Sequence, residues 1–408
     1  MFQAGAASRG RILDLVSLLD SEKYMAIFEQ SRARDPKRYL WMLGLIAPAC
    51  ALLPGPLVVL TGSPVFWWIG PIIVFVVIPL LDWTIGNDGS NPHDEDYEAL
   101  SNDRYYRWCT YLFLPMQFFG LLVAGFLWAD TALSFVDKLG LTVTLGVVSG
   151  IGINAAHELG HRSEHLERWL SKIALAQSAY GHFFVEHNRG HHARVATPDD
   201  PASARFGESL WVFLPRSMFG GLRSAFRLER DRLARRNKRW FSYENHLLQA
   251  WSMSVVLFGA MILCFGPRVI PWLALQALIG ALLLETVNYV EHYGLLRVRR
   301  ADGTFGRCSP RDSWNSDSLV TNIFLFHLQR HSDHHANPGR RYQTLRSVEQ
   351  APQLPMGYAG MVLLAAVPPL WRAVIDPRVL DHYGGDRSLV NVKPPRKRPV
   401  EGAGDRAR

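Results

Sequence analysis

Hydrophobic and polar positions alternate in long blocks along the 408-residue chain. Six apolar runs each extend over about 20 residues, the length that an α-helix needs to cross a bilayer. Charge-rich blocks separate them, which argues against six buried helices of a soluble protein. The pattern therefore predicts an all-α integral membrane protein with six transmembrane helices. The runs are Tyr39–Leu60, Val65–Ile85, Cys109–Ala129, Leu139–Ala156, Leu247–Phe265 and Val269–Val287.

The first apolar run differs from the other five in its proline content. It contains Pro48, Pro54 and Pro56. Proline lacks a backbone N–H and clashes with the preceding helical turn. We therefore expect a kink or an early stop in this run.

Charge predicts the topology of the chain. Six spans place both termini on one side, and the loops on the other side (61–64, 130–140 and 266–268) contain only Lys138 and Arg268 of the 44 Lys and Arg residues. Basic residues collect on the cytoplasmic side of membrane proteins. Both termini are therefore expected in the cytoplasm. The net charge of +8 follows largely from this asymmetry, so no nucleic-acid partner is predicted.

Composition suggests three segments and excludes two kinds of site. Residues 1–38 are predicted as a polar N-terminal segment, 39–390 as the membrane unit and 391–408 as a disordered basic tail. The chain has four cysteines and no Cys-x-x-Cys pair. A disulfide framework and an iron–sulfur site are therefore not expected.

Histidine spacing supplies the candidate chemistry. Eight of the 15 histidines fall in three short clusters beside apolar runs, and a ninth stands alone. On an α-helix, residues three and four apart share a face, so each cluster is expected to aim its imidazoles at one point. The clusters are His157 and His161; His187, His191 and His192; and His331, His334 and His335; the ninth residue is His292.

These imidazoles predict a metal site with two ions. Imidazole nitrogen suits iron, zinc, copper and nickel, whereas magnesium and calcium prefer oxygen ligands. Nine imidazoles are too many for one first-row ion and suit two. One alternative remains open, because His157-Glu-Leu-Gly-His161 also matches the zinc metalloprotease pattern. A protease would leave most of the other histidines unexplained.

Four segments resemble the signatures of bacterial membrane alkane 1-monooxygenases, within the histidine-rich membrane desaturase and hydroxylase superfamily. The likeness extends from about Tyr39 to Gly385 and includes Pro79-Leu-Leu-Asp82. The His-Tyr-Gly element separates this family from fatty-acid desaturases; Arg162 is a small departure, because lysine is usual there. The segments are His157-Glu-Leu-Gly-His-Arg162, Glu186-His-Asn-Arg-Gly-His-His192, Asn288-Tyr-Val-Glu-His-Tyr-Gly294 and Leu328-Gln-Arg-His-Ser-Asp-His-His335.

The resemblance implies a non-haem di-iron monooxygenase of the bacterial inner membrane. It would use O2 and electrons from rubredoxin, itself reduced by a reductase, to hydroxylate the terminal methyl of n-alkanes. The eight clustered histidines and the isolated His292 would together hold the two irons at the cytoplasmic face. The family also implies that Val74, on the second span, limits how far the alkane tail extends; valine there predicts medium to fairly long substrates.

Carboxylates near the histidines are candidates for catalytic or positioning roles. A ligating histidine usually donates its second N–H to a carboxylate or a carbonyl. Glu291 and Asp333 lie within the motifs, and Glu285 lies two helical turns before His292. An ionisable group at the end of an apolar span is a functional candidate by default. We therefore select Glu285, Glu291 and Asp333.

Other readings stay open at this point. A related di-iron enzyme could act on a different substrate, as a fatty-acyl desaturase, a fatty-acyl hydroxylase or a xylene-type methyl hydroxylase. The basic stretch Arg223–Arg239 could contact anionic lipid headgroups or an acidic electron donor. A metal transporter would need polar residues in the middle of the spans, and these are sparse.

Overall fold

A computed structural model describes residues 34–392. Within that range the fold is all-α, with isolated β-bridges only. Residues 1–33 of the polar N-terminal segment and the basic tail beyond residue 392 lie outside the described residues. Asn391, where the tail was expected to begin, is buried and bonded through its backbone to Phe206 and Gly294.

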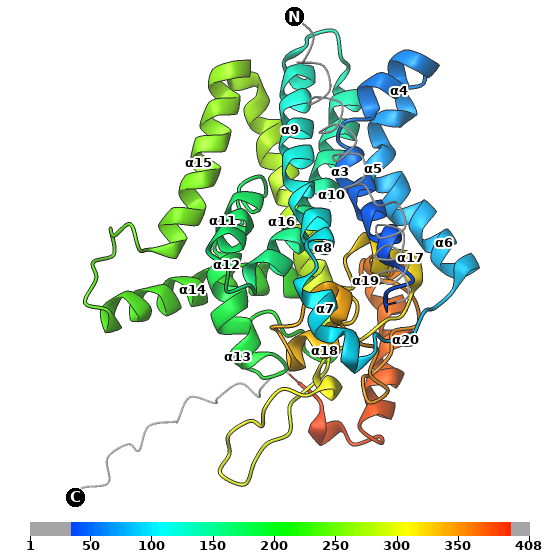
Figure 1. The fold of residues 1–408 in the computed structure, drawn as a ribbon, viewed down its shortest axis with the longest axis vertical. Helices are drawn as coiled ribbons and strands as arrows, with labels where there is room; N and C mark the ends of the chain where they lie inside the picture. Colours follow the sequence, from blue (N-terminus) through cyan, green and yellow to red (C-terminus); the bar gives the residue numbers. More distant parts are fainter. Residues whose placement is uncertain (1–33, 393–408) are drawn as a thin grey trace, which may run out of the picture.

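Between residues 34 and 392, five helical segments are long and apolar enough to cross a membrane, and this confirms a multi-pass helical fold. Figure 1 shows most of them standing side by side along the long axis of the molecule. The segments are Pro64–Ile85 (η2 Pro64–Trp68, α5 Ile69–Ile72, η3 Ile73–Val77, α6 Ile78–Ile85), Arg104–Ala129 (α8 Arg104–Tyr111, α9 Phe113–Ala129), α10 Phe135–Gly160, α15 His246–Phe265 and Pro267–His292 (η6 Pro267–Val269, α16 Ile270–His292).

The remaining expected span, the first along the chain, is broken. Its two halves are Arg38–Ala49 (η1 Arg38–Leu45 and α3 Ile46–Ala49) and α4 Pro54–Thr61, and they meet at 75°. The bend lies beside Pro54, where a helix can begin but cannot continue from the preceding turn. The expected kink is therefore confirmed.

Helix α10 is the central element and packs closely against α16. It contains a Gly146-Val-Val-Ser-Gly150 motif. A Cβ atom added at Gly146 would lie 2.6 Å from Ile279, and one added at Gly150 would lie 2.8 Å from Leu283. Small residues let two helix backbones approach within a membrane protein. This approach brings together the C-terminal ends of α10 and α16.

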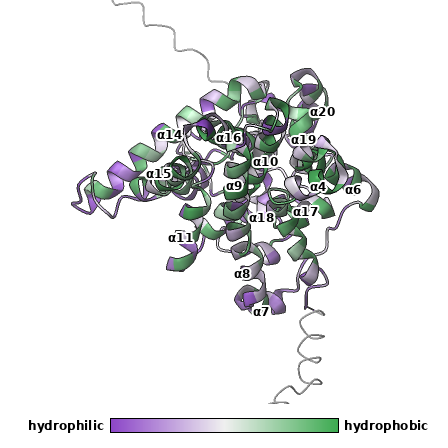
Figure 2. Cartoon of the chain, turned by 90° about the horizontal axis from the view of Figure 1, so that it is seen from above, coloured by the Kyte–Doolittle hydropathy of each residue, from purple (hydrophilic) through white to green (hydrophobic). Residues whose placement is uncertain are grey.

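Shorter helices form a cap around those ends. They include α7 Tyr97–Asn102, α11 His165–Ala174, α12 Phe183–Glu186, η5 His187–His191, α13 His192–Arg194, α17 Leu319–Phe324, α18 His331–Ala336, α19 Tyr358–Ala365 and α20 Pro368–His382. A longer helix, α14 Leu210–Arg235, runs across the direction of the upright helices (Figure 1). Viewed from above, hydrophobic positions dominate the bundle, whereas α7 and the outer end of α14 are hydrophilic (Figure 2).

Candidate metal centre

The nine predicted histidines lie in two adjacent groups where α10 and α16 end against the cap. His157 is on α10 and His161 caps it, while His292 is the last residue of α16. The other six come from η5, α13 and α18. Four separate parts of the sequence therefore supply one centre.

The first group contains five imidazoles, each with one ring nitrogen that lies within 4.8 Å of those of the other four. The Nε2 atoms of His157 and His334 are 3.0 Å apart, and the Nε2 atom of His187 is 3.0 Å from that of His161. Two members, His161 and His192, are only half-buried. The members are His157, His161, His187, His192 and His334.

The second group contains four imidazoles, all buried. The Nε2 atom of His331 is 3.1 Å from that of His292 and 2.9 Å from that of His335. His191 completes the group, with its Nε2 atom 3.2 Å from that of His335. One residue from η5 therefore meets one from α16 and two from α18.

The grouping corrects one expectation from the sequence. We expected each cluster to aim at a single point, but two clusters divide between the groups. His187 to His191 form a π-helix, in which the backbone repeat is five residues rather than four. His187 therefore pairs with His192, at 3.0 Å between Nε2 atoms, and His191 turns to the other group.

The donor set fits two metal ions. Burial, together with the neighbouring imidazoles, lowers the pKa of His187, His334 and His335 well below the usual range. These rings are therefore neutral at pH 7, and each offers a nitrogen lone pair. Each Nε2 atom carries either one proton or one lone pair, so hydrogen bonds cannot satisfy every one of these contacts between nitrogens 2.9–3.2 Å apart, whereas a cation between them can. Iron, copper, zinc and nickel accept this ligand type.

Asp200 orients one of these imidazoles, and the sequence reasoning missed it. Its Oδ2 atom is 2.9 Å from Nδ1 of His191 and accepts a bond from Ser203. The carboxylate is fully buried. Such a bond fixes the ring so that Nε2 faces the metal. The available signal was the Thr-Pro-Asp-Asp-Pro segment that ends at Pro201.

The three predicted carboxylates occupy different positions. Glu291 lies beside the second group, with Oε2 3.2 Å from Nε2 of His331. Glu285 accepts hydrogen bonds from Tyr180 at 2.6 Å and from Ser217 at 2.5 Å. It lines a polar hollow that also contacts His187 and His191.

Asp333 has partners other than an imidazole. Its carboxylate accepts bonds from Asn337 and from the backbone and guanidinium of Arg346. The structure therefore gives Asp333 a role in fixing the segment after α18. We had expected it to accept an imidazole N–H.

Glu158, the glutamate of the protease-like pattern, also points elsewhere. Its Oε1 atom is 2.8 Å from Arg162 and accepts the backbone N–H of Tyr342. A metalloprotease needs this carboxylate as a general base beside a metal-bound water. The pairing of Glu158 with Arg162 disfavours the protease reading.

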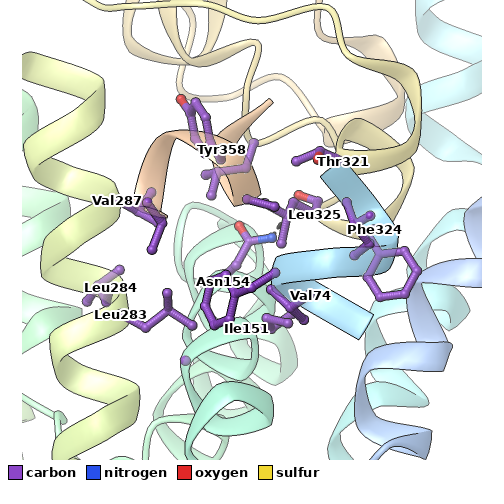
Figure 3. Close-up of a pocket in the computed structure, with 16 residues that line it drawn as sticks. Val74, Ile151, Asn154, Leu283, Leu284, Val287, Thr321, Phe324, Leu325 and Tyr358 are labelled. Atoms are coloured by element: carbon purple, nitrogen blue, oxygen red, sulfur yellow. Dashed lines mark hydrogen bonds between the residues drawn. The ribbon is translucent and has the colours of Figure 1, made fainter. Parts of the chain in front are cut away.

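An apolar cavity lies beside the centre, among the spans. It is partly open, and the space between its lining atoms, counted with the space at its mouth, is about 590 Å³. Figure 3 shows side chains from the second span, α10, α16 and the cap converging on it. Val74 on η3 is one of the lining residues and is buried. Among the lining residues only Asn154, Thr321 and Tyr358 are polar. The lining contains no Asp, Glu, Lys or Arg.

A smaller hollow lies between this cavity and the histidines. Its lining includes His157, His187, Glu291 and His331. It shares four lining residues with the apolar cavity: Asn154, Leu284, Val287 and Leu328. The apolar cavity therefore adjoins a hollow that is lined by members of both imidazole groups.

Comparisons with known proteins agree with this geometry. The fatty acid desaturase family model matches residues 138–365. The alkane 1-monooxygenase of Acinetobacter baylyi is 44% identical over 90% of this chain and 91% of its own length. The enzymes of that name from Pseudomonas putida and Ectopseudomonas oleovorans are 43% and 41% identical, over 88% and 91% of this chain and 89% and 92% of their own lengths.

The chain belongs to the alkane 1-monooxygenase family. This confirms the resemblance drawn from the four histidine segments. Membership of the wider desaturase family follows from the match that covers more than half of the chain.

Several residues that line the apolar cavity lie in segments without a histidine motif. Tyr358, Ala359 and Val362 on α19 line the apolar cavity, as do Thr321 and Phe324 on α17. Their sequence signal was weak, because α17 and α19 are shorter than any span.

Proposed function

We propose that this chain is a membrane di-iron monooxygenase that hydroxylates the terminal methyl group of medium to long n-alkanes. The observation that carries the proposal is an apolar cavity that adjoins a hollow lined by members of two groups of convergent imidazoles. The relatives named alkane 1-monooxygenase support the same reaction. Two irons would be held by the nine histidines of the two groups, and they supply the O2-dependent oxidation of a C–H bond.

The cavity suits a substrate without polar groups. An alkane offers nothing to hydrogen-bond, so its binding rests on burial, at about 0.8 kcal/mol per methylene. A fatty-acyl substrate would need a partner for its polar end, and the cavity lining has no lysine or arginine. This favours an alkane over the acyl substrates of desaturases.

Shape would select the terminal carbon. A narrow cavity lets an unbranched chain enter by its end, so the methyl group is the first carbon to reach the imidazole groups. Val74 would lie along the tail and limit its length. The apolar walls also exclude water from the reacting carbon.

The carboxylates would have separate roles. Glu291, 3.2 Å from His331, would complete the second group with a negative ligand or hydrogen bond. Glu285 would hold the polar hollow beside His187 and His191 through Tyr180 and Ser217. Asp333 would stabilise the segment that carries α18.

Electrons would come from rubredoxin, reduced by its reductase, at the cytoplasmic face. The placement of the enzyme in the inner membrane, with both termini and the metal centre in the cytoplasm, rests on the distribution of Lys and Arg. This membrane placement is part of the proposal.

The test is reconstitution followed by product analysis. The protein is loaded anaerobically with ferrous iron and supplied with O2, reduced rubredoxin and a ladder of n-alkanes. We expect about two irons per chain and 1-alkanols as products by mass spectrometry. A single zinc, or oxidation of acyl chains in preference to alkanes, would overturn the proposal.

A further inference from the structure

The exposed face of α14 changes character along its length. Its first half presents apolar side chains, including Trp211 and Phe219, which is 74% exposed. Its second half presents Arg223, Arg227 and Arg230 on the same face. These arginines are four and three residues apart, so they follow one another along one side of the helix.

The arginines line a cavity with aromatic walls. It contains about 790 Å³ of open space and is lined by Arg223, Phe226, Arg227, Arg230 and Trp240. The rings of Phe226 and Trp240 stack with centroids 5.4 Å apart. Phe226 also contacts Trp251 of α15, at 5.2 Å between centroids. The aromatic wall is therefore fixed to a membrane span.

These arginines lack acidic partners that would neutralise them. Within residues 34–392, Arg223 and Arg227 have no ion pair, and Arg230 has only the exposed neighbour Asp231 at 3.3 Å. Two basic residues beyond the cavity are paired: Arg232 with the buried Glu229, and Lys238 with Glu244. The cavity therefore gathers three arginines that no buried carboxylate neutralises, beside an aromatic wall.

We propose that this cavity binds the phosphodiester headgroup of an anionic phospholipid. The guanidinium groups would contact the phosphate oxygens, for which their planar geometry is suited. The acyl chains would lie along the apolar first half of α14, over Phe219 and Trp211. Because α14 runs across the spans (Figure 1), one lipid could contact both halves of its exposed face.

An acidic protein fits this surface less well. A water-soluble partner would match the arginines but would not need the adjoining exposed Phe219 and Trp211. An amphipathic helix with aromatic and basic residues on its exposed face is typical of the membrane interface. The continuity between apolar and basic positions therefore favours a lipid.

The test compares two variants that lose the same charge. The cavity variant carries Arg223→Gln, Arg227→Gln and Arg230→Gln. The control variant carries Arg235→Gln, Arg236→Gln and Arg239→Gln, which lie outside the cavity lining. Binding of dioleoylphosphatidylglycerol and dioleoylphosphatidylcholine to the detergent-purified, metal-loaded protein is measured by native mass spectrometry and by the shift in Tm.

We expect phosphatidylglycerol to bind the wild type more tightly than phosphatidylcholine. The cavity variant should lose about 100-fold in affinity for phosphatidylglycerol, from about fivefold per arginine, and the control less than about fivefold. Metal content should be unchanged in both, which shows that each variant is folded.

Four outcomes would overturn the assignment. The two lipids could bind the wild type equally, or the two variants could lose equal affinity. Glycerol 3-phosphate could also displace the lipid, which would make the cavity a site for free phosphate. A cavity variant that keeps its lipid affinity but binds an acidic donor protein less tightly would assign the surface to that protein instead.

Discussion

The two imidazole groups differ in number, burial and surroundings. The first has five histidines, and two of them, His161 and His192, are half-buried. The second has four, all buried, and adds Glu291 at 3.2 Å from His331 and Asp200 at 2.9 Å from His191. The first group thus consists of neutral imidazoles, two of which lie near the surface. The second group is enclosed and has two carboxylates beside its imidazoles. The two ions we propose would therefore experience different charge and different access to solvent.

The largest expected effect is the loss of a ligand from either group. His161→Ala removes one from the first group and His292→Ala one from the second. Each should abolish hydroxylation, because the reaction we propose needs both ions. Each should also lower the iron content from about two per chain toward one, since the other group stays intact. Iron analysis and turnover of an alkane check this, and near-wild-type values in both variants would refute the ligand assignment.

The sequence predicted the nine histidines but not their division into two groups. Spacing along an α-helix placed His187 beside His191, and the π-helix of η5 instead places it beside His192. A π-helix has no reliable signal in one sequence, because it differs from an α-helix by a single residue in one turn. The division therefore depends on how the cap packs.

The spans were predictable for a different reason. A run of about 20 apolar residues fixes a span by length alone, and the prolines near Pro54 marked the one that breaks. The apolar cavity was predictable only at Val74, through the family resemblance. Its other walls, such as Tyr358 on α19, are brought there by tertiary contacts, which periodicity does not encode.

The second-largest effect should be a loss of metal affinity when Asp200 is replaced, and this loss should be confined to the second group. Asp200→Asn removes the charge that fixes the His191 ring. Loss of such a partner typically lowers metal affinity about 10- to 100-fold. Titration with a chelator should then release one ion much earlier than the other.

Asp199→Asn is the matched control for this measurement. Asp199 is the neighbouring residue and is exposed, so its replacement should leave both ions as tightly bound as in the wild type. If Asp200→Asn and Asp199→Asn release metal alike, the bond to His191 does not distinguish the groups.

Val74 tests a feature that both groups share, because the hollow that adjoins the apolar cavity is lined by members of each group. Val74→Trp should fill the cavity and cut turnover of the longest alkanes, while short ones are spared. One methylene changes binding in an apolar pocket by about 1–3 kcal/mol, or roughly 10- to 200-fold. Val76→Trp is the control, since Val76 is 52% exposed on the same segment. Product yields across an alkane ladder check this; identical length profiles for the two variants would assign the length limit to another residue.

The smallest effect should be a loss of stability when Arg162, next to the first group, is replaced. Its guanidinium donates to the carbonyls of Gly339 and Arg340 and pairs with Glu158. Lysine, the usual residue in the family, has a single ammonium group in place of the planar guanidinium group. It therefore cannot reach all three partners at once. Arg162→Lys should therefore cost about 1–3 kcal/mol of stability, from one or two lost hydrogen bonds.

Metal content should not change in this variant, because the side chain of Arg162 bonds to backbone and to Glu158 rather than to an imidazole. Arg378→Lys is the control: Arg378 is exposed and bonds only to the carbonyl of Val374 in its own helix. A lower Tm for Arg162→Lys alone, with two irons retained, would show that the first group depends on its histidines and not on this neighbouring ion pair. Loss of iron at unchanged Tm would show the opposite, and would make the first group as dependent on its surroundings as the second.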